Sequence, residues 1–178
     1  MGRLKQVLPY RGQTLVAHAV QQALDAAFSP IIVVVGAEAE LVVAAVDSLP
    51  VEIVRNDVWE SGMGSSIVAG MRYLEVSNPS AVAILLGDQP LVATPHLRAM
   101  SALLDSSKIV AAAYNGTLGV PALFRRELFT RLASLAPQAG ARHLLRNSSY
   151  EITAYPLPEA AVDIDTPEDL QALAPTPN

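Results

Sequence analysis

The sequence contains no cysteine, and this absence excludes several kinds of chemistry at once. Without a thiol the chain cannot form a disulfide framework, bind zinc through thiolates or use a cysteine nucleophile. Aromatic residues are also scarce, at 5% of the chain against 51% hydrophobic residues in all. We therefore expect a core built mainly from valine, leucine, isoleucine and alanine.

Long apolar runs and a positive net charge are missing as well. The longest apolar stretches, over residues 31–37 and 81–87, are far too short to cross a bilayer. No export signal opens the chain, and together with the missing cysteines this predicts a cytoplasmic protein. A net charge of −5 argues against a general nucleic-acid-binding protein. Three basic residues nevertheless occur within the first dozen positions: Arg3, Lys5 and Arg11. They either bind an anion or belong to a solvated terminus.

Short apolar runs alternate with helical patterns along the chain, which is typical of βαβ units and a mostly parallel sheet. The strands are expected at 30–36, 51–56, 81–90, 108–116, 119–124 and 150–157. The helices are expected at 14–27 and 38–48, through Ile67 to Leu74, from an N-cap at Thr94, and at about 126–135, about 139–147 and 163–173. The prediction is one three-layer α/β/α domain over residues 1–173 with a disordered tail at 174–178.

Ligands bind outside the carboxyl ends of the strands in an open parallel sheet, so the residues after each apolar run carry most information. Asp88 follows the run at 81–87, and Gly87 is expected to allow close approach of the backbone. Asp88 is either a functional carboxylate or a turn-initiating aspartate. Asp165 lies late in the chain in "DIDTP", where it is either a second site carboxylate or a helix cap. Two carboxylates at one sheet edge suit Mg²⁺ bound with substrate phosphates.

A third loop, "SGMGSS" at 61–66, stands ahead of a helix. Its glycines and hydroxyls predict exposed backbone N–H groups that bind a base edge or an anion, although a plain glycine-rich turn has the same composition. Together the three loops and the early cations favour phosphoryl or nucleotidyl transfer, in which charge neutralisation dominates. The three histidines fall in predicted helices and are interpreted as surface or structural residues: His18, His96 and His143.

Six motifs occur in a fixed order along nearly the whole chain: "MGRLKQVLPYRGQTLV", "ESGMGSSIVAGM", "LLGDQPLV", "GVPALF", "AGARHLL" and "VDIDTPEDL". In this order they resemble the MobA-like nucleotidyltransferases, most closely the molybdenum cofactor cytidylyltransferase branch. The resemblance implies a Rossmann-like α/β fold of the GT-A type. It also implies Mg²⁺-dependent transfer of a nucleoside monophosphate, here CMP from CTP, to a phosphorylated acceptor such as molybdopterin, with release of pyrophosphate. A molybdoenzyme or its chaperone is the protein partner it suggests.

The resemblance also assigns roles residue by residue. Lys5 contacts the triphosphate and acts in catalysis with Asp88, which binds the metal together with Asp165. The nucleotide-binding residues are Gly2, Arg3, Lys5, Gly62, Gly64, Ser65, Ser66 and Gly87. The acceptor-binding residues are Gln89, Gly119, Pro121 and Arg142.

The chain departs from the family pattern in two places. Val120 stands where many relatives carry a polar residue between the glycine and the proline. Relatives also place a first strand and a "LAAGxSxR" phosphate loop ahead of the motif that begins here at Met1, so the fold is expected to lack its first strand. Two alternatives follow: a relative using GTP or another phosphorylated acceptor, or a non-catalytic nucleotide- or cofactor-binding accessory protein for a molybdoenzyme.

Overall fold

The computed structural model describes residues 4–146, 150–164, 169–170 and 173. Its helices are α1 (Leu15–Asp25), α2 (Ala39–Val46), α3 (Met63–Leu74), α4 (Thr94–Leu103), α5 (Phe129–Ala133) and α6 (Ala141–Arg146). Its strands are β1 (Pro9–Tyr10), β2 (Gln13–Thr14), β3 (Ile32–Val35), β4 (Glu52–Arg55), β5 (Ala81–Ile84), β6 (Ile109–Tyr114), β7 (Thr117–Arg125) and β8 (Ile152–Pro156). Four 3₁₀ turns complete it: η1 (Lys5–Val7), η2 (Trp59–Ser61), η3 (Arg126–Leu128) and η4 (Pro158–Ala161). Among the described residues, no helix is long and apolar enough to span a membrane.

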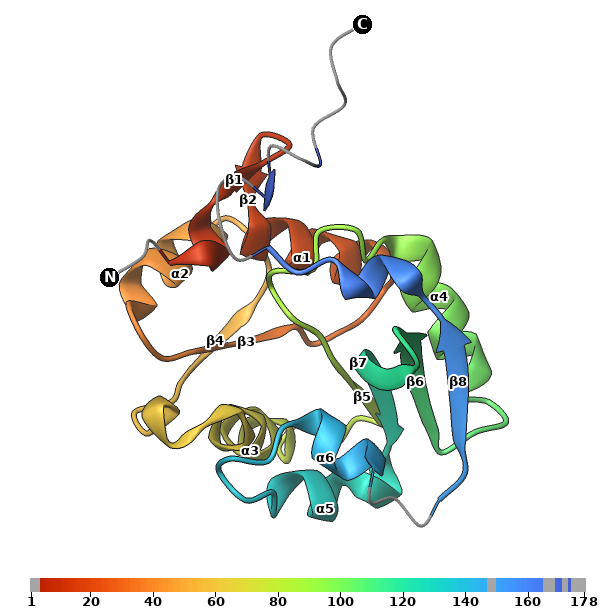
Figure 1. The fold of residues 1–178 in the computed structure, drawn as a ribbon. Helices are drawn as coiled ribbons and strands as arrows, with labels where there is room; N and C mark the ends of the chain where they lie inside the picture. Colours follow the sequence, from red (N-terminus) through yellow and green to blue (C-terminus); the bar gives the residue numbers. More distant parts are fainter. Residues whose placement is uncertain (1–3, 147–149, 165–168, 171–172, 174–178) are drawn as a thin grey trace, which may run out of the picture.

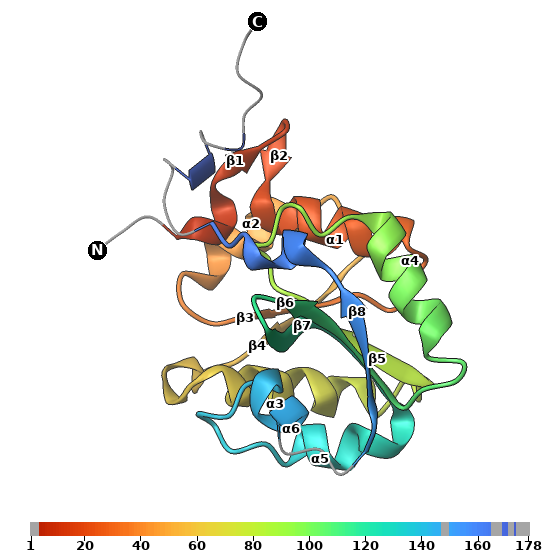
Figure 2. The ribbon, with the colours of Figure 1, turned by 45° about the vertical axis from the view of Figure 1, so that its right-hand side comes forward.

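Strands β3 to β8 form a layer between two sets of helices, with α1, α2 and α4 on one side and α3, α5 and α6 on the other, and the β1–β2 hairpin lies outside this layer, beyond α1 (Figures 1 and 2). β6 packs against both sets of helices, because successive side chains point to opposite sides of a strand. Val110 and Ala112 pack with α4, whereas Ile109 and Ala111 pack with α3, α5 and α6. The α/β class expected from the sequence is confirmed.

The strand layer consists of separate sheets. β3 and β4 pair in parallel, and a four-stranded sheet has the order β5-β7-β6-β8. In that sheet β7 runs antiparallel to β5 and β6, and β8 is parallel to β6. The carboxyl ends of β5, β6 and β8 therefore lie at one edge, as the sequence argument required.

Both β3 and β5 lie at the margin of a sheet in the part of the chain that the structure describes. β5 pairs with β7 on one side, and its four residues are only half-buried. The sequence predicts a longer and fully buried strand at 81–90, and this expectation is wrong in two respects. β5 ends at Ile84, and a strand with one paired edge leaves part of its apolar surface accessible.

The basic segment at the start of the described chain folds into a hairpin that the sequence analysis missed. β1 and β2 pair antiparallel around Arg11 and Gly12, whose φ angles of 48° and 83° fit a two-residue hairpin turn. α1 follows directly, with the Thr14 hydroxyl accepting a hydrogen bond from the Ala17 N–H as its N-cap. α4 differs from expectation, because Ala93 occupies its N-cap position. The Thr94 hydroxyl instead donates to the Gln22 carbonyl across the helix pair.

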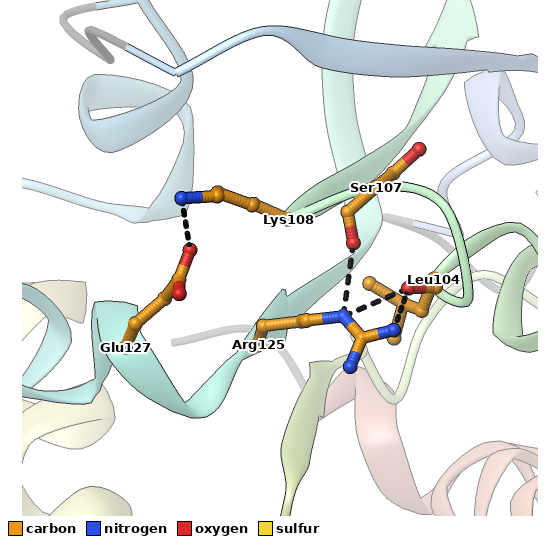
Figure 3. Close-up of polar contacts among 5 residues, drawn as sticks. All are labelled: Leu104, Ser107, Lys108, Arg125 and Glu127. Atoms are coloured by element: carbon orange, nitrogen blue, oxygen red, sulfur yellow. Dashed lines mark hydrogen bonds and ion pairs between the residues drawn. The ribbon is translucent and has the colours of Figure 1, made fainter.

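The edge of the sheet away from the carboxyl ends is held by charged side chains (Figure 3). Arg125, at the end of β7, donates from Nε to the Leu104 carbonyl at 2.8 Å and to the Ser107 carbonyl at 3.2 Å, and from Nη2 to Leu104 again. Lys108 forms an ion pair with Glu127 at 2.8 Å. These contacts tie the segment after α4 to the β6–β7 pair.

Candidate functional site

The candidate site is centred on the loop that follows β5. The Lys5 ammonium lies 2.7 Å from Oδ2 of Asp88, so η1 and this loop meet through an ion pair. The side chain of Asp88 is 11% exposed and that of Lys5 is 31% exposed. The other carboxylate oxygen, Oδ1, is buried and has no hydrogen-bond partner in the described structure. An unpaired buried carboxylate oxygen is costly, so this atom is an acceptor that a cation or a donor would satisfy.

Two further buried acceptors surround Asp88. The side-chain oxygens of Gln6 and Gln89 likewise have no partner in the described structure. Gln6 packs beside Gly87, where a Cβ would meet the Gln6 side chain and Val16 only at ordinary contact distances of 3.6–3.7 Å. A side chain at Gly87 would therefore be tolerated by the surrounding protein atoms, and the expected close approach to a ligand stays a prediction. The shared feature of the cluster is an excess of oxygen acceptors beside one ammonium group.

The late acidic segment reaches the same loop. The backbone N–H of Ile164 donates to the carbonyl of Asp88 at 3.0 Å, and the Ile164 side chain is fully buried. The next residue, Asp165, lies outside the described residues, as do Gly2 and Arg3. The hydrogen bond nevertheless attaches the chain immediately before Asp165 to Asp88.

Gln89 connects the loop to the neighbouring elements. Its amide nitrogen donates to the Ala160 carbonyl at 2.7 Å and lies 3.5 Å from the Val120 carbonyl. The β6–β7 pairing skips Val120 and Pro121, which form a bulge beside Gln89. Gly119 lies next to this bulge, and a side chain there would displace the Tyr114 ring, because a Cβ would be 2.3 Å from the Tyr114 hydroxyl. Three of the four predicted acceptor-binding residues therefore adjoin the Asp88 loop: Gln89, Gly119 and Pro121.

The glycine loop at 61–66 forms a second group of predicted site residues. Its backbone N–H groups are largely occupied within the protein, contrary to expectation. Those of Ser61, Gly62 and Ser65 donate to the preceding turns, and that of Gly64 donates to the Pro137 carbonyl at 2.8 Å. The segment 136–140 packs so closely on the loop that a Cβ on Gly64 would lie 2.2 Å from a carbonyl oxygen.

Asn56 organises the hydroxyl groups of this loop, and the sequence analysis did not single it out. Asn56 is buried at the end of β4, and its amide nitrogen donates to Ser65 at 2.8 Å and to Ser66 at 2.9 Å. Ser65 is buried and donates to the Gly62 carbonyl, whereas Ser66 is half-buried. The rule that identified Asp88 also applies to Asn56, because Asn56 is a polar residue directly after the carboxyl end of the parallel strand β4.

Arg142 lies in α6, which follows the segment that covers the glycine loop. It is an exposed residue of α6, one position after Ala141, and a Cβ on Gly140 would contact Met63 at 3.5 Å. α6 therefore continues from the segment that covers the glycine loop. Figure 1 shows α3, which the glycine loop begins, on the opposite side of β3 and β4 from α1 and α2.

Comparison with known proteins places this geometry in a family. The profile of the MobA-like NTP transferase domain matches residues 1–153. The chain belongs to the MobA-like NTP transferase family.

Two curated members of similar length resemble this MobA-like chain. It is 32% identical to the nicotine blue oxidoreductase of Paenarthrobacter nicotinovorans over 180 residues, which cover 95% of this chain and 87% of that protein. It is 30% identical to the purine catabolism protein PucB of Bacillus subtilis (strain 168), with the same coverage of both chains.

Solved structures share the fold of this MobA-like chain. The manganese complex of Rv0371c from Mycobacterium tuberculosis H37Rv aligns with a TM-score of 0.76 and 27% identity, covering 95% of this chain and 90% of that one. A nucleotidyl transferase from Methanothermobacter, Mth528, aligns with a TM-score of 0.79 over 95% of this chain and 82% of that one. Its 23% identity supports the shared fold.

Proposed function

We propose that this MobA-like protein transfers a nucleoside monophosphate from an NTP, CTP in the first instance, to a phosphorylated acceptor such as molybdopterin. An oxygen of the acceptor phosphate attacks the α-phosphorus of CTP. The bond from that phosphorus to the oxygen bridging to the β-phosphate breaks, and pyrophosphate leaves. The observation that carries the proposal is the Lys5–Asp88 pair at 2.7 Å with its unpartnered carboxylate oxygen.

In this proposal Lys5 binds phosphate oxygens and Asp88 binds the metal ion. The Lys5 ammonium is partly exposed, so it can bind the triphosphate oxygens and stabilise the charge that develops on the leaving pyrophosphate. The predicted roles of Gly2 and Arg3 place them on the same phosphates. The acceptor is expected beside Gln89, Gly119 and Pro121, and the nucleotide beside the loop that contains Ser66.

The family implies a divalent cation, and Asp88 fits one. Mg²⁺ typically takes one or two carboxylates and completes its shell with phosphates and water. Among the described residues no group of three acidic or histidine side chains is placed to hold a metal alone. Asp88 offers a buried unpaired oxygen, and Asp165 is the predicted second ligand. When bound, the cation supplies charge neutralisation on the phosphates.

Release of pyrophosphate from each of the four NTPs, with molybdopterin and other phosphorylated acceptors, tests the proposal. We expect release with CTP and an acceptor in the presence of Mg²⁺, and loss of most of it in Asp88→Asn, which keeps the side-chain shape. Asp105→Asn, at an exposed position, is the control and should behave as wild type. Near-normal turnover by Asp88→Asn refutes the role of the carboxylate. Nucleotide binding without pyrophosphate under every condition favours the accessory-protein alternative.

The 32% identity to a protein named as an oxidoreductase supports a second candidate, reduction of a small molecule. A reductase consumes NADH or NADPH in the presence of its acceptor, and nucleotidyl transfer consumes neither. The same preparations, followed at the absorbance of the reduced nicotinamide, separate the two activities. If the protein is a reductase that does not use the metal, Asp88→Asn should keep most of that activity.

A further inference from the structure

His18 is a buried polar residue in a helix that otherwise packs through small and aliphatic side chains. It lies on α1 with 7% exposure, between Ala17 and Ala19. The ring of Tyr10 meets it edge-on at 4.9 Å between centroids. A buried imidazole needs partners for both nitrogens, since an unpaired buried polar group is costly. His18 has a partner at each.

The two partners fix which nitrogen carries the proton. Nε2 lies 3.2 Å from the carbonyl oxygen of Pro90, which can only accept, so Nε2 is the protonated nitrogen. Nδ1 lies 3.2 Å from the side-chain amide nitrogen of Gln13 and accepts from it. Burial lowers the pKa of His18, and Arg11 lowers it further, against the opposite effect of the Pro90 carbonyl. One neutral tautomer therefore satisfies both contacts.

Pro90 belongs to the loop that carries Asp88. Two hydrogen bonds attach this loop to the segment that follows β8, from the Ile164 N–H to the Asp88 carbonyl and from the Gln89 amide to the Ala160 carbonyl. The His18 contact comes from α1, which packs against η1, the turn that carries Lys5.

The same histidine is also linked to the segment that bears Lys5. Gln13 lies in the β1–β2 hairpin, which starts two residues after η1. Backbone hydrogen bonds connect the hairpin base, because the Leu15 N–H donates to Leu8 and the Leu8 N–H donates to Lys5. Through its two nitrogens His18 thus joins the chain that positions the ammonium group to the loop that positions the carboxylate.

We propose that His18 is a positioning residue for the transfer: its Nε2–H holds the Pro90 carbonyl and thereby keeps the Asp88 carboxylate in register with Lys5. This inference rests on the proposed function. A small displacement of a positioned catalytic group is enough to slow a reaction greatly. A histidine that only filled space would instead affect folding, with activity falling in proportion to the folded fraction.

Two substitutions separate these roles. His18→Phe keeps a flat ring against Tyr10 and removes the donor to Pro90. His18→Gln loses the ring but retains an amide N–H at a similar reach. We expect His18→Gln to keep most of the wild-type kcat. We expect His18→Phe to lower kcat about 10- to 100-fold with KM for CTP changed less than threefold.

Two further measurements accompany the kinetics. The first is the urea midpoint of each variant. The second is the affinity for Mn²⁺ in the presence of CTP, titrated by the electron paramagnetic resonance signal of the free ion. We expect His18→Phe to bind Mn²⁺ several-fold more weakly than His18→Gln, by more than any difference in folded fraction between the two variants explains. Should His18→Phe fail to fold, His18→Asn replaces it, because the shorter amide does not reach Pro90.

The proposal is overturned if both variants match wild type in kcat and Mn²⁺ affinity, or if both lose activity in proportion to lost stability. The Mn²⁺ titration also distinguishes this failure from that of the proposed function. If the wild-type protein releases no pyrophosphate from any NTP, nucleotidyl transfer is refuted. The Mn²⁺ affinities then decide the role of His18: a weaker His18→Phe supports positioning of Asp88, and equal affinities overturn it.

Discussion

Arg125 offers the clearest stability prediction, because it joins three elements through backbone carbonyl groups. Its guanidinium donates to Leu104 just beyond α4 and to Ser107 just before β6 (Figure 3). These carbonyls have few other partners available, since the last carbonyls of a helix lack intrahelical donors. The side chain is only partly accessible, so water replaces these bonds incompletely once the guanidinium is removed.

Arg125→Met removes the donors while retaining an unbranched stem of similar length. A hydrogen bond from a charged donor contributes about 1.5–3 kcal/mol net, and less where solvent enters. One good contact at 2.8 Å and a weaker one at 3.2 Å therefore give an expected loss of about 2 kcal/mol in the free energy of unfolding. For a chain of this size that corresponds to a fall in Tm of roughly 4–8 °C.

Urea unfolding followed by circular dichroism measures this loss, and the neighbouring Arg126→Met is a matched control. Arg126 is exposed, and within the described chain its side chain makes one hydrogen bond, to the Pro79 carbonyl at 3.2 Å, so its replacement should cost less than about 0.5 kcal/mol. Both variants should keep the wild-type kcat, because both arginines lie at the edge of the sheet away from Asp88. Equal stabilities of the two variants would refute the reasoning.

Three other predictions concern the site. Gly64→Ala should destabilise the protein by about 1–3 kcal/mol, because its Cβ overlaps three carbonyl oxygens of the covering segment, whereas Gly140→Ala meets only a flexible methionine and should be nearly neutral in the same urea assay. Lys5→Met should raise the Mn²⁺ affinity of the nucleotide-free protein, because it removes the ammonium group that competes with the metal for Asp88. The same variant should bind CTP more weakly. Unchanged Mn²⁺ and CTP affinities in isothermal titration calorimetry contradict the pairing of Lys5 with the metal site and its contact with the triphosphate. The lowered pKa of His18 means that the unfolded chain binds its proton first as pH falls. Stability should therefore decline as pH drops below the ordinary histidine value of 6.5, and a decline equally steep in His18→Gln argues against this origin.

Local patterns predicted the main helices and strands because each carries its own periodicity. α1 and β3 fall within one to two residues of the expected bounds, since an apolar face at helical spacing and a β-branched run are read without knowing the partner. The β1–β2 hairpin was missed because two-residue strands have no periodicity. Its signal is the Arg11-Gly12 turn, in which both residues adopt positive φ.

The site was predictable up to the point where distant segments meet. Asp88 was singled out because it directly follows a predicted strand, and ligands bind outside the carboxyl ends of such strands. The same reasoning applied to Asn56 would have singled out the residue that donates to Ser65 and Ser66. The contact between His18 and Pro90 joins residues 72 apart in sequence, and no local pattern encodes it. The occupied N–H of Gly64 was hidden for the same reason, because its acceptor, Pro137, comes from a segment that folds back much later.

The occupied amides of the glycine loop change how a nucleotide can be bound. A cradle of free N–H groups would have let this loop share the charge of the triphosphate. With the amides of Ser61, Gly62, Gly64 and Ser65 used internally, the loop offers chiefly hydroxyl groups, of which Ser66 is the more accessible. Hydroxyls suit a base or ribose better than three phosphates. In the proposed reaction the negative charge must therefore be met by Lys5 and by a cation at Asp88, which makes their precise placement the condition for turnover.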